Sequence, residues 1–157
     1  MAVIGCRMGE PHIKAVIAND NANLYAACDL DDTLLARIKE TYKPEIATKN
    51  WKELINDPKI DAVVVATPDK LHLEMTEAFL MAGKDVLCEK PMAPSLAECD
   101  EMIRTRNETG VKLSIIAQNR FRKPIRDLKA LLDSGLAGPV RHATINSLWW
   151  RGHCYYD

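Results

Sequence analysis

The chain carries almost no excess of charge. Its 157 residues include 21 lysines and arginines against 22 aspartates and glutamates, a formal net charge of −1 at pH 7. The two signs are mixed along the chain, which gives no electrostatic support for binding nucleic acid or a membrane surface. Long apolar runs are also missing, since no stretch approaches the roughly 18–20 residues of a membrane span. The first residues lack the basic region of a secretory signal, and we therefore expect a cytoplasmic protein.

Paired cysteines are absent as well. The five cysteines are odd in number, and no two have the C-x-x-C spacing of a zinc or redox site. Cys6, Cys28 and Cys88 stand at the ends of apolar runs, where free cysteine behaves as a small buried hydrophobic residue. His153 and Cys154 are neighbours, but two ligands are too few for a metal site, so we expect no metal.

Short apolar segments alternate with amphipathic ones from the first residue to about residue 120. We expect strands at residues 2–6, 24–28, 45–48, 62–66, 86–88 and 111–117, with the runs at 62–66 and 86–88 buried. Between them lie helical patterns with capping signals at Asp31 or Asp32, at Asn50 and at Ser95 with Glu98. This alternation is typical of βαβ units. The sequence therefore predicts an α/β fold with a doubly wound parallel sheet, the Rossmann fold.

Two helix predictions depend on proline. Pro11 is favoured in a first turn, so we expect the first helix to begin near it. Pro124 opens a later helix whose apolar face should point inward; this face consists of Ile125, Leu128, Leu131 and Leu132.

A glycine-containing loop lies between the first strand and the first helix, the place of a dinucleotide fingerprint. The full fingerprint is G-x-G-x-x-G; here the loop is one residue shorter and lacks the middle glycine, reading Gly5-Cys6-Arg7-Met8-Gly9. Asp29 follows the second strand, where an acid hydrogen-bonds the ribose 2′-hydroxyl of NAD. The alternative is that Asp29 caps a helix and does not bind a cofactor. An acid there would repel a 2′-phosphate, so the sequence favours NAD over NADP.

Polar residues follow three other strands. Thr67, before Pro68, could hydrogen-bond a cofactor, and His72 is either a site residue or a surface or capping histidine. Glu89 and Lys90 come directly before Pro91, after a strand, and in open α/β sheets ligands bind beyond the carboxyl ends of strands. The alternative is that these two residues are surface charges on a solvated loop. Two more candidate site residues, Asn119 and Arg120, follow the last strand. The alternative for Arg120 is that it lies on the protein surface and belongs to no site.

Four segments in this order carry a family resemblance: Val3 to Cys6, Asp61 to Pro68 with His72, Gly83 to Pro91, and Arg120-Phe121. The chain resembles the N-terminal part of the Gfo/Idh/MocA family, the glucose–fructose oxidoreductase and inositol dehydrogenase relatives. The resemblance implies a Rossmann domain followed by a second α/β domain with an open antiparallel sheet. On that basis we expect residues 1–121 to form the nucleotide-binding domain, and residues 122–157 to form a linker helix and the first strand of a truncated second domain. The resemblance also implies NAD(P)-dependent oxidation of a sugar or polyol hydroxyl. It also implies that Lys90 lies beside the reacting hydroxyl, and that the Lys–Pro bond is often cis.

The resemblance and the loops together define a candidate site. Lys90 is the candidate catalytic residue. The residues expected to bind the dinucleotide are Gly5, Cys6, Arg7, Met8, Gly9, Asp29, Thr67, Pro68, His72, Glu89, Lys90, Asn119 and Arg120.

Family members are roughly twice this long, and their catalytic aspartate and histidine lie in the second half, beyond Asp157. We therefore expect the nucleotide-binding part of a dehydrogenase. The alternatives are a non-catalytic nucleotide-binding module and a remnant that binds nothing.

The last segment is rich in β-forming and aromatic residues. Residues 140–150 have strand-like composition, and Trp149, Trp150, Tyr155 and Tyr156 add apolar surface that a monomer seldom exposes. An unpaired strand edge is open to pairing with another chain. We expect this segment to pair with a second copy of the chain, to fold back or to stay disordered, and pairing is our first choice.

Overall fold

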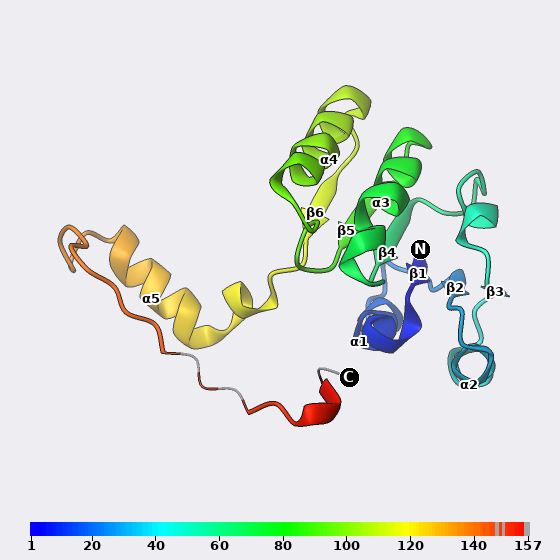
Figure 1. Cartoon of the computed structure of the whole chain (residues 1–157), viewed down its shortest axis with the longest axis horizontal. Helices are drawn as coiled ribbons and strands as arrows, with labels where there is room; N and C mark the ends of the chain where they lie inside the picture. The colour runs from blue at the N-terminus through cyan, green and yellow to red at the C-terminus, as the bar shows by residue number, and fades with distance from the viewer. Residues whose placement is uncertain (147, 149, 156–157) are drawn as a thin grey trace. The chain divides into compact units, whose positions relative to one another are not determined.

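The computed structural model describes residues 1–146, 148 and 150–155 (Figure 1). The chain divides into two compact units, Met1–Ala117 and Gln118–Asp157. The functional boundary that we place at residue 121 stays a prediction, because compact packing and functional assignment are different properties.

The first unit is built on a six-stranded sheet in the order β3-β2-β1-β4-β5-β6, and every pair of neighbours is parallel. This confirms the predicted doubly wound sheet. The strands are β1 (Ala2–Ile4), β2 (Ala26–Cys28), β3 (Ile46–Thr48), β4 (Ala62–Val65), β5 (Asp85–Cys88) and β6 (Leu113–Ile115). The helices of this unit are α1 (Cys6–Ile17), α2 (Asp32–Tyr42), α3 (His72–Met81) and α4 (Leu96–Thr109), with the 3₁₀ helices η1 (Trp51–Leu54) and η2 (Asp69–Leu71).

Helices cover the two faces of the sheet, as Figure 1 shows. On one face, Ile4, Val65 and Cys88 are buried in the cluster that contains Phe79 of α3 and Met102 of α4. On the other face, Val3 and Val64 are buried in the cluster that contains Ile13 of α1 and Ile38 of α2. The sheet has two apolar faces because its strands carry no polar alternation.

One strand prediction is only partly correct. Leu87 in β5 pairs with Val64 of β4, and its side chain is 38% exposed. The reason is that α1 and α2 pack on β1 to β4, so the same face of β5 has less cover.

The predicted start of the first helix is wrong. Helix α1 begins at Cys6, directly after Gly5, and Pro11 lies inside it. Gly5 turns the chain in the left-handed region with φ 85°, and the carboxylate of Asp29 accepts a hydrogen bond from the Cys6 amide at 2.7 Å. The helix continues through Pro11, although this residue has no N–H to donate, because Ile13 and Val16 are buried beyond it.

Local capping signals are confirmed. The side chains of Asp31, Asn50 and Ser95 accept hydrogen bonds from the backbone amides of Leu34, Lys52 and Glu98, at 3.0, 3.2 and 3.3 Å. Each cap satisfies an amide that the helix itself leaves unbonded.

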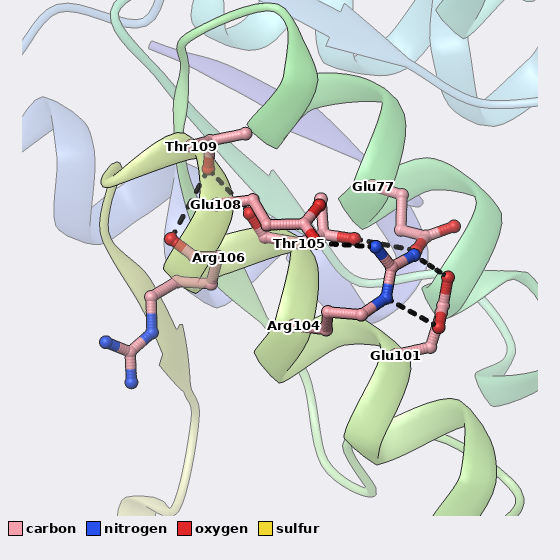
Figure 2. Close-up of polar contacts among 7 residues, drawn as sticks. All are labelled: Glu77, Glu101, Arg104, Thr105, Arg106, Glu108 and Thr109. Carbon is pink, nitrogen blue, oxygen red and sulfur yellow. Dashed lines mark hydrogen bonds and ion pairs between the residues drawn. The ribbon is translucent and has the colours of Figure 1, made fainter.

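Helices α3 and α4 lie side by side and are joined by polar contacts (Figure 2). The hydroxyl of Thr105, a buried residue of α4, donates to Glu77 Oε1 of α3 at 2.9 Å. On the exposed side of α4, the Arg104 guanidinium binds Glu101 and Glu108, one turn away in each direction (Figure 2). These two carboxylates raise the pKa of Arg104, with the Glu101 hydrogen bond as the larger cause.

The second unit contains η3 (Gln118–Phe121), α5 (Lys123–Asp133) and η4 (His153–Tyr155). Pro124 lies in the first turn of α5, as predicted. The expectation of an inward apolar face is wrong for this unit: Ile125, Leu128, Leu131 and Leu132 are all exposed. Within the described residues of this unit, 118–146, 148 and 150–155, no second layer of helix or strand covers this face.

Residues 140–150 form no strand in their described part, 140–146, 148 and 150. Val140, Ile145, Leu148 and Trp150 are exposed. The expected features at Trp149 and Tyr156 lie outside the described residues.

Candidate functional site

The parallel sheet brings the ends of β1, β2, β4 and β5 to one rim. The hydrogen bonds between the strands continue into the loops that follow them. The backbone amides of Gly5, Ala66 and Glu89 donate to the carbonyl oxygens of Cys28, Ile4 and Val65, at 2.9, 2.8 and 2.8 Å. Gly5, Asp29, Thr67 and Lys90 therefore lie at the same rim, because each follows the carboxyl end of its strand. In open α/β sheets this is the edge at which ligands bind.

Gly5 and Gly9 perform two of the three tasks of the fingerprint glycines. A Cβ on Gly5 would lie 2.5 Å from the Ala66 carbonyl oxygen, so this backbone touches the loop after β4. A Cβ on Gly9 would lie 2.7 Å from a methyl group of Val3, so the absence of a side chain lets α1 approach β1. The missing task is that of the middle glycine, which lets the backbone approach a pyrophosphate.

Asp29 is bound on both carboxylate oxygens. Oδ2 accepts from the Cys6 amide at 2.7 Å, and Oδ1 accepts from the Asp31 amide at 3.0 Å. The structure thus shows the capping role, directed at α1, while Asp31 caps α2. A carboxylate oxygen has two lone pairs, so these bonds leave acceptor capacity for a ribose hydroxyl.

The three residues between the glycines differ in exposure. The Cys6 thiol is buried and donates to the Cys28 carbonyl at 3.5 Å; burial raises the pKa of this thiol to about 12. The Cys6 amide is bound to Asp29 and the thiol is buried, so both groups are occupied within the protein. Arg7 is exposed, and its guanidinium lies 3.5 Å from an Asp31 oxygen. Met8 is exposed beside it.

The loop after β4 is ordered by a buried histidine. Thr67 is half-buried, and its hydroxyl donates to the Met75 sulfur at 3.5 Å, while Pro68 precedes η2 and is exposed. His72, at the start of α3, is 1% exposed, so it is not a surface histidine. Its ring nitrogens lie 2.9 Å from the carbonyl oxygens of Thr67 and Pro91.

The Glu89-Lys90-Pro91 turn contains a cis Lys90–Pro91 bond. Glu89 Oε1 lies 2.9 Å from Nε2 of His12, and Oε2 accepts from the Lys90 amide at 3.0 Å. Lys90 itself is exposed. The sequence reasoning missed His12. The signal was its spacing: it lies three residues after Gly9, on the same face of α1.

Asn119 and Arg120 fall in η3 of the second unit, and both are exposed. Their contribution to the site stays a prediction.

A hollow lies away from this rim. It has a volume of about 580 Å³, lies at the opposite, amino end of the sheet, and is lined by residues that include Met1, Tyr25 and Asp61 but none of the candidate site residues. Among the described residues, no group of three or more His, Cys, Asp or Glu side chains could hold a metal ion. None of the described helices is long and apolar enough to cross a membrane.

Comparison with known proteins decides the family. Residues 1–117 match the family model described as oxidoreductase family, NAD-binding Rossmann fold. The chain belongs to the Gfo/Idh/MocA oxidoreductase family. This confirms the resemblance drawn from the Ala-Thr-Pro and Glu-Lys-Pro segments, and with it the NAD-binding Rossmann fold.

Two curated relatives of this Gfo/Idh/MocA chain are inositol dehydrogenases. Myo-inositol 2-dehydrogenase of Thermotoga maritima is 36% identical over 148 residues, covering 94% of this chain and 44% of the relative. Inositol 2-dehydrogenase of Rhizobium meliloti is 33% identical over 141 residues, covering 90% of this chain and 42% of the relative. The chain therefore spans less than half the length of these two relatives.

One of the solved structures similar to this chain contains a dinucleotide and a polyol. Scyllo-inositol dehydrogenase from Lactobacillus casei, with bound NAD(H) and scyllo-inositol, superposes with a TM-score of 0.82 at 26% identity. The superposition covers 87% of this chain and 41% of the other.

Proposed function

We propose that the chain is the dinucleotide-binding part of an NAD-dependent dehydrogenase that oxidises a hydroxyl group of a polyol or sugar. The observation that carries the proposal is the rim itself, where Gly5, Asp29 and Lys90 follow the carboxyl ends of β1, β2 and β5 in one parallel sheet. The inositol dehydrogenases among the relatives support the substrate class.

The N-terminus of α1 fits a dinucleotide pyrophosphate. The Cys6 amide is bound to Asp29, and the Gly9 amide donates to the Gly5 carbonyl at 2.8 Å. Between them lie the amides of Arg7 and Met8, in the helical turn where amides have no acceptor within the helix. Such amides bind phosphate groups, and the helix dipole favours the negative charge.

The remaining site residues have separate tasks in this proposal. Asp29 accepts a ribose hydroxyl, and Thr67 offers a hydroxyl group to the cofactor. Bound NAD supplies the hydride acceptor. Lys90 is exposed at the rim, and in its neutral amine form it would take the proton of the substrate hydroxyl as the hydride leaves for NAD.

The shortened loop should weaken nucleotide binding. Arg7 and Met8 carry a Cβ where the full fingerprint has its middle glycine, and a Cβ keeps the backbone away from phosphate. The Arg7 guanidinium should partly compensate by pairing with a phosphate oxygen, since its side chain is 82% exposed and its contact with Asp31 is long, at 3.5 Å.

Two further properties belong to the proposal. A cytoplasmic location is supported by five free cysteines, because thiols persist in reducing compartments. Self-association through residues 140–150 is supported by the exposed apolar side chains of Val140, Ile145 and Trp150.

Calorimetric titration with NADH and NADPH tests the cofactor proposal. We expect NADH to bind more tightly than NADPH. Asp29→Asn keeps an oxygen acceptor for the Cys6 amide and removes the charge, so it should narrow the preference by about tenfold, since like charges about 4 Å apart repel by roughly 1–4 kcal/mol. Asp100→Asn on α4 is the control and should leave the preference unchanged. Tight binding of NADPH with none of NADH would contradict the proposal.

A further inference from the structure

His12 and Glu89 form a partly buried contact between helix α1 and the rim. His12 Nε2 lies 2.9 Å from Glu89 Oε1, and the two side chains are 21% and 14% exposed. Arg7, on the same helix, makes a longer contact of 3.5 Å with Asp31, and both of those side chains are more exposed. Because water screens exposed pairs, the His12–Glu89 contact should be the stronger of the two.

The carboxylate of Glu89 determines the direction of this hydrogen bond. An ionised carboxylate only accepts hydrogen bonds, so Nε2 of His12 carries a hydrogen and donates it. A neutral ring with its hydrogen on Nε2 and a charged ring both meet this requirement, so the contact does not depend on the charge of His12. The second oxygen of Glu89, Oε2, accepts from the Lys90 amide at 3.0 Å. One carboxylate thus connects a side chain of α1 to the backbone of Lys90.

Both ends of this connection are held by the folded sheet. Ile13, the neighbour of His12, is buried in the apolar cluster between α1 and the sheet, and the missing side chain of Gly9 lets α1 approach β1. The Glu89 amide donates to the Val65 carbonyl oxygen at 2.8 Å. The Glu89 side chain has several rotatable bonds, and ordering it costs conformational entropy. His12, on a fixed helix, supplies a partner that holds this side chain in one place.

We propose that His12 is a positioning residue for Lys90 and acts through the Glu89 carboxylate. The side chain of Lys90 is exposed, whereas its amide is bound to Glu89, and Glu89 is bound to the helix whose first turn we assign to the dinucleotide. The contact therefore keeps the Lys90 turn in a constant place relative to that helix, as a reaction between held groups requires. The role towards the cofactor rests on the proposed function, whereas the connection from His12 to the Lys90 amide does not.

Amide hydrogen exchange, followed residue by residue with NMR, tests the connection. His12→Leu removes the donor and keeps a side chain of similar size, and His12→Gln keeps an N–H donor. We expect exchange at the Lys90 amide to quicken by about tenfold in His12→Leu, the effect of weakening one hydrogen bond to a charged group. It should return towards the original rate in His12→Gln. The Glu89 amide, bound to the backbone of Val65, should keep its rate in both variants.

Two results of this experiment would overturn the proposal. One is an unchanged rate at Lys90 in His12→Leu, and the other is an equal change at Glu89 and Lys90, which indicates a general loosening of the turn. His142→Leu, the same substitution at an exposed histidine, is the control and should change neither amide. His12→Ala replaces His12→Leu if the latter does not fold, because alanine is small and favours a helix.

A double-mutant cycle shows whether His12 acts through Glu89. Glu89→Ala removes the carboxylate and should itself quicken exchange at the Lys90 amide, because this amide loses its acceptor. Adding His12→Leu to Glu89→Ala should then have no further effect on Lys90, since residues that act through one contact are not additive. A further loss as large as that in the unaltered chain would mean that His12 acts by another route, and it would overturn the proposal.

NADH distinguishes this proposal from the proposed function. If the unaltered chain binds NADH, we expect nuclear Overhauser contacts between the Lys90 side chain and the nicotinamide ring. These contacts should weaken in His12→Leu and recover in His12→Gln, and equal contacts in all three chains would overturn the role towards the cofactor. If the unaltered chain does not bind NADH, the proposed function fails, while the exchange measurements still decide whether His12 holds Lys90 through Glu89.

Discussion

Gly5 satisfies two independent requirements at one backbone position. Its φ of 85° lies in the region that favours glycine, and an added Cβ would lie 2.5 Å from the Ala66 oxygen and 2.9 Å from the Thr67 nitrogen. Gly110, which ends α4, shares only the first requirement: its φ is 71°, and nothing lies within 4 Å of an added Cβ. Comparing Gly5 with Gly110 therefore distinguishes the cost of a positive φ from the cost of a Cβ that collides with a neighbouring backbone.

Gly5→Ala should destabilise the chain more than Gly110→Ala. Both variants force a left-handed alanine, which costs about 1–2 kcal/mol. Gly5→Ala adds an overpacking cost of roughly 1–3 kcal/mol, because the Ala66 backbone cannot easily move. Urea denaturation measures both free energies of unfolding. Equal losses in the two variants would show that the contact with Ala66 is unimportant.

Helices α1 and α2 are joined by a carboxylate. Glu10 of α1 binds the Arg37 guanidinium of α2 through both oxygens, at 2.7 and 3.0 Å, and accepts from the Tyr42 hydroxyl at 2.7 Å. The hydrogen bonds from Arg37, and then that from Tyr42, lower the pKa of Glu10 from 4.5 to about 2. This contact orients the helix that begins the nucleotide site.

Glu10 should make the stability of the chain depend on pH in the acid range. Its folded-state pKa is depressed, so its contribution is complete above pH 4.5 and is lost as the pH falls towards 2. Glu10→Gln should therefore lower the melting temperature above pH 4.5, and the difference should shrink towards pH 2. Thermal melts followed by circular dichroism at several pH values measure this. The control is Glu40→Gln, at an exposed position of α2, and a difference that does not vary with pH would rule out the Glu10 contact as its source.

Considered as a whole, the chain contains one of the catalytic groups that the family resemblance implies. Lys90 is present, whereas the aspartate and histidine of the family lie in the second half of longer members. We expect the isolated chain to produce no NADH from NAD with inositol or glucose, measured by absorbance. Robust NADH production that is lost in Lys90→Ala would refute this expectation, and Lys112→Ala, at an exposed lysine far along the chain, is the control.

The end of the chain exposes apolar side chains that favour self-association. Ile145 and Leu148 are 90% and 94% exposed. We expect the full chain to form dimers or larger assemblies and a version ending at Gly138 to remain monomeric, as measured by light scattering. If both versions are monomers of equal solubility, self-association through this segment is wrong.

Local sequence alone determined the helix caps and the order of the elements. Asp31, Asn50 and Ser95 cap their helices through bonds that span two or three residues, so sequence spacing suffices to predict them. The alternation of strand and helix also predicted that Gly5, Asp29, Thr67 and Lys90 share one rim, because parallel strands all end at the same edge. Placement of Asn119 and Arg120 at that rim stays a prediction.

Tertiary packing decided the contacts that shape the site. His12 and Glu89 are 77 residues apart in sequence, and Asp29 reaches Cys6 across 23. The burial of His72, the start of α1 at Cys6 and the exposure of Leu87 likewise depend on how the helices and loops pack on the sheet. No local pattern encodes these features, because a side chain's surroundings are set by residues that only the folded sheet brings next to it.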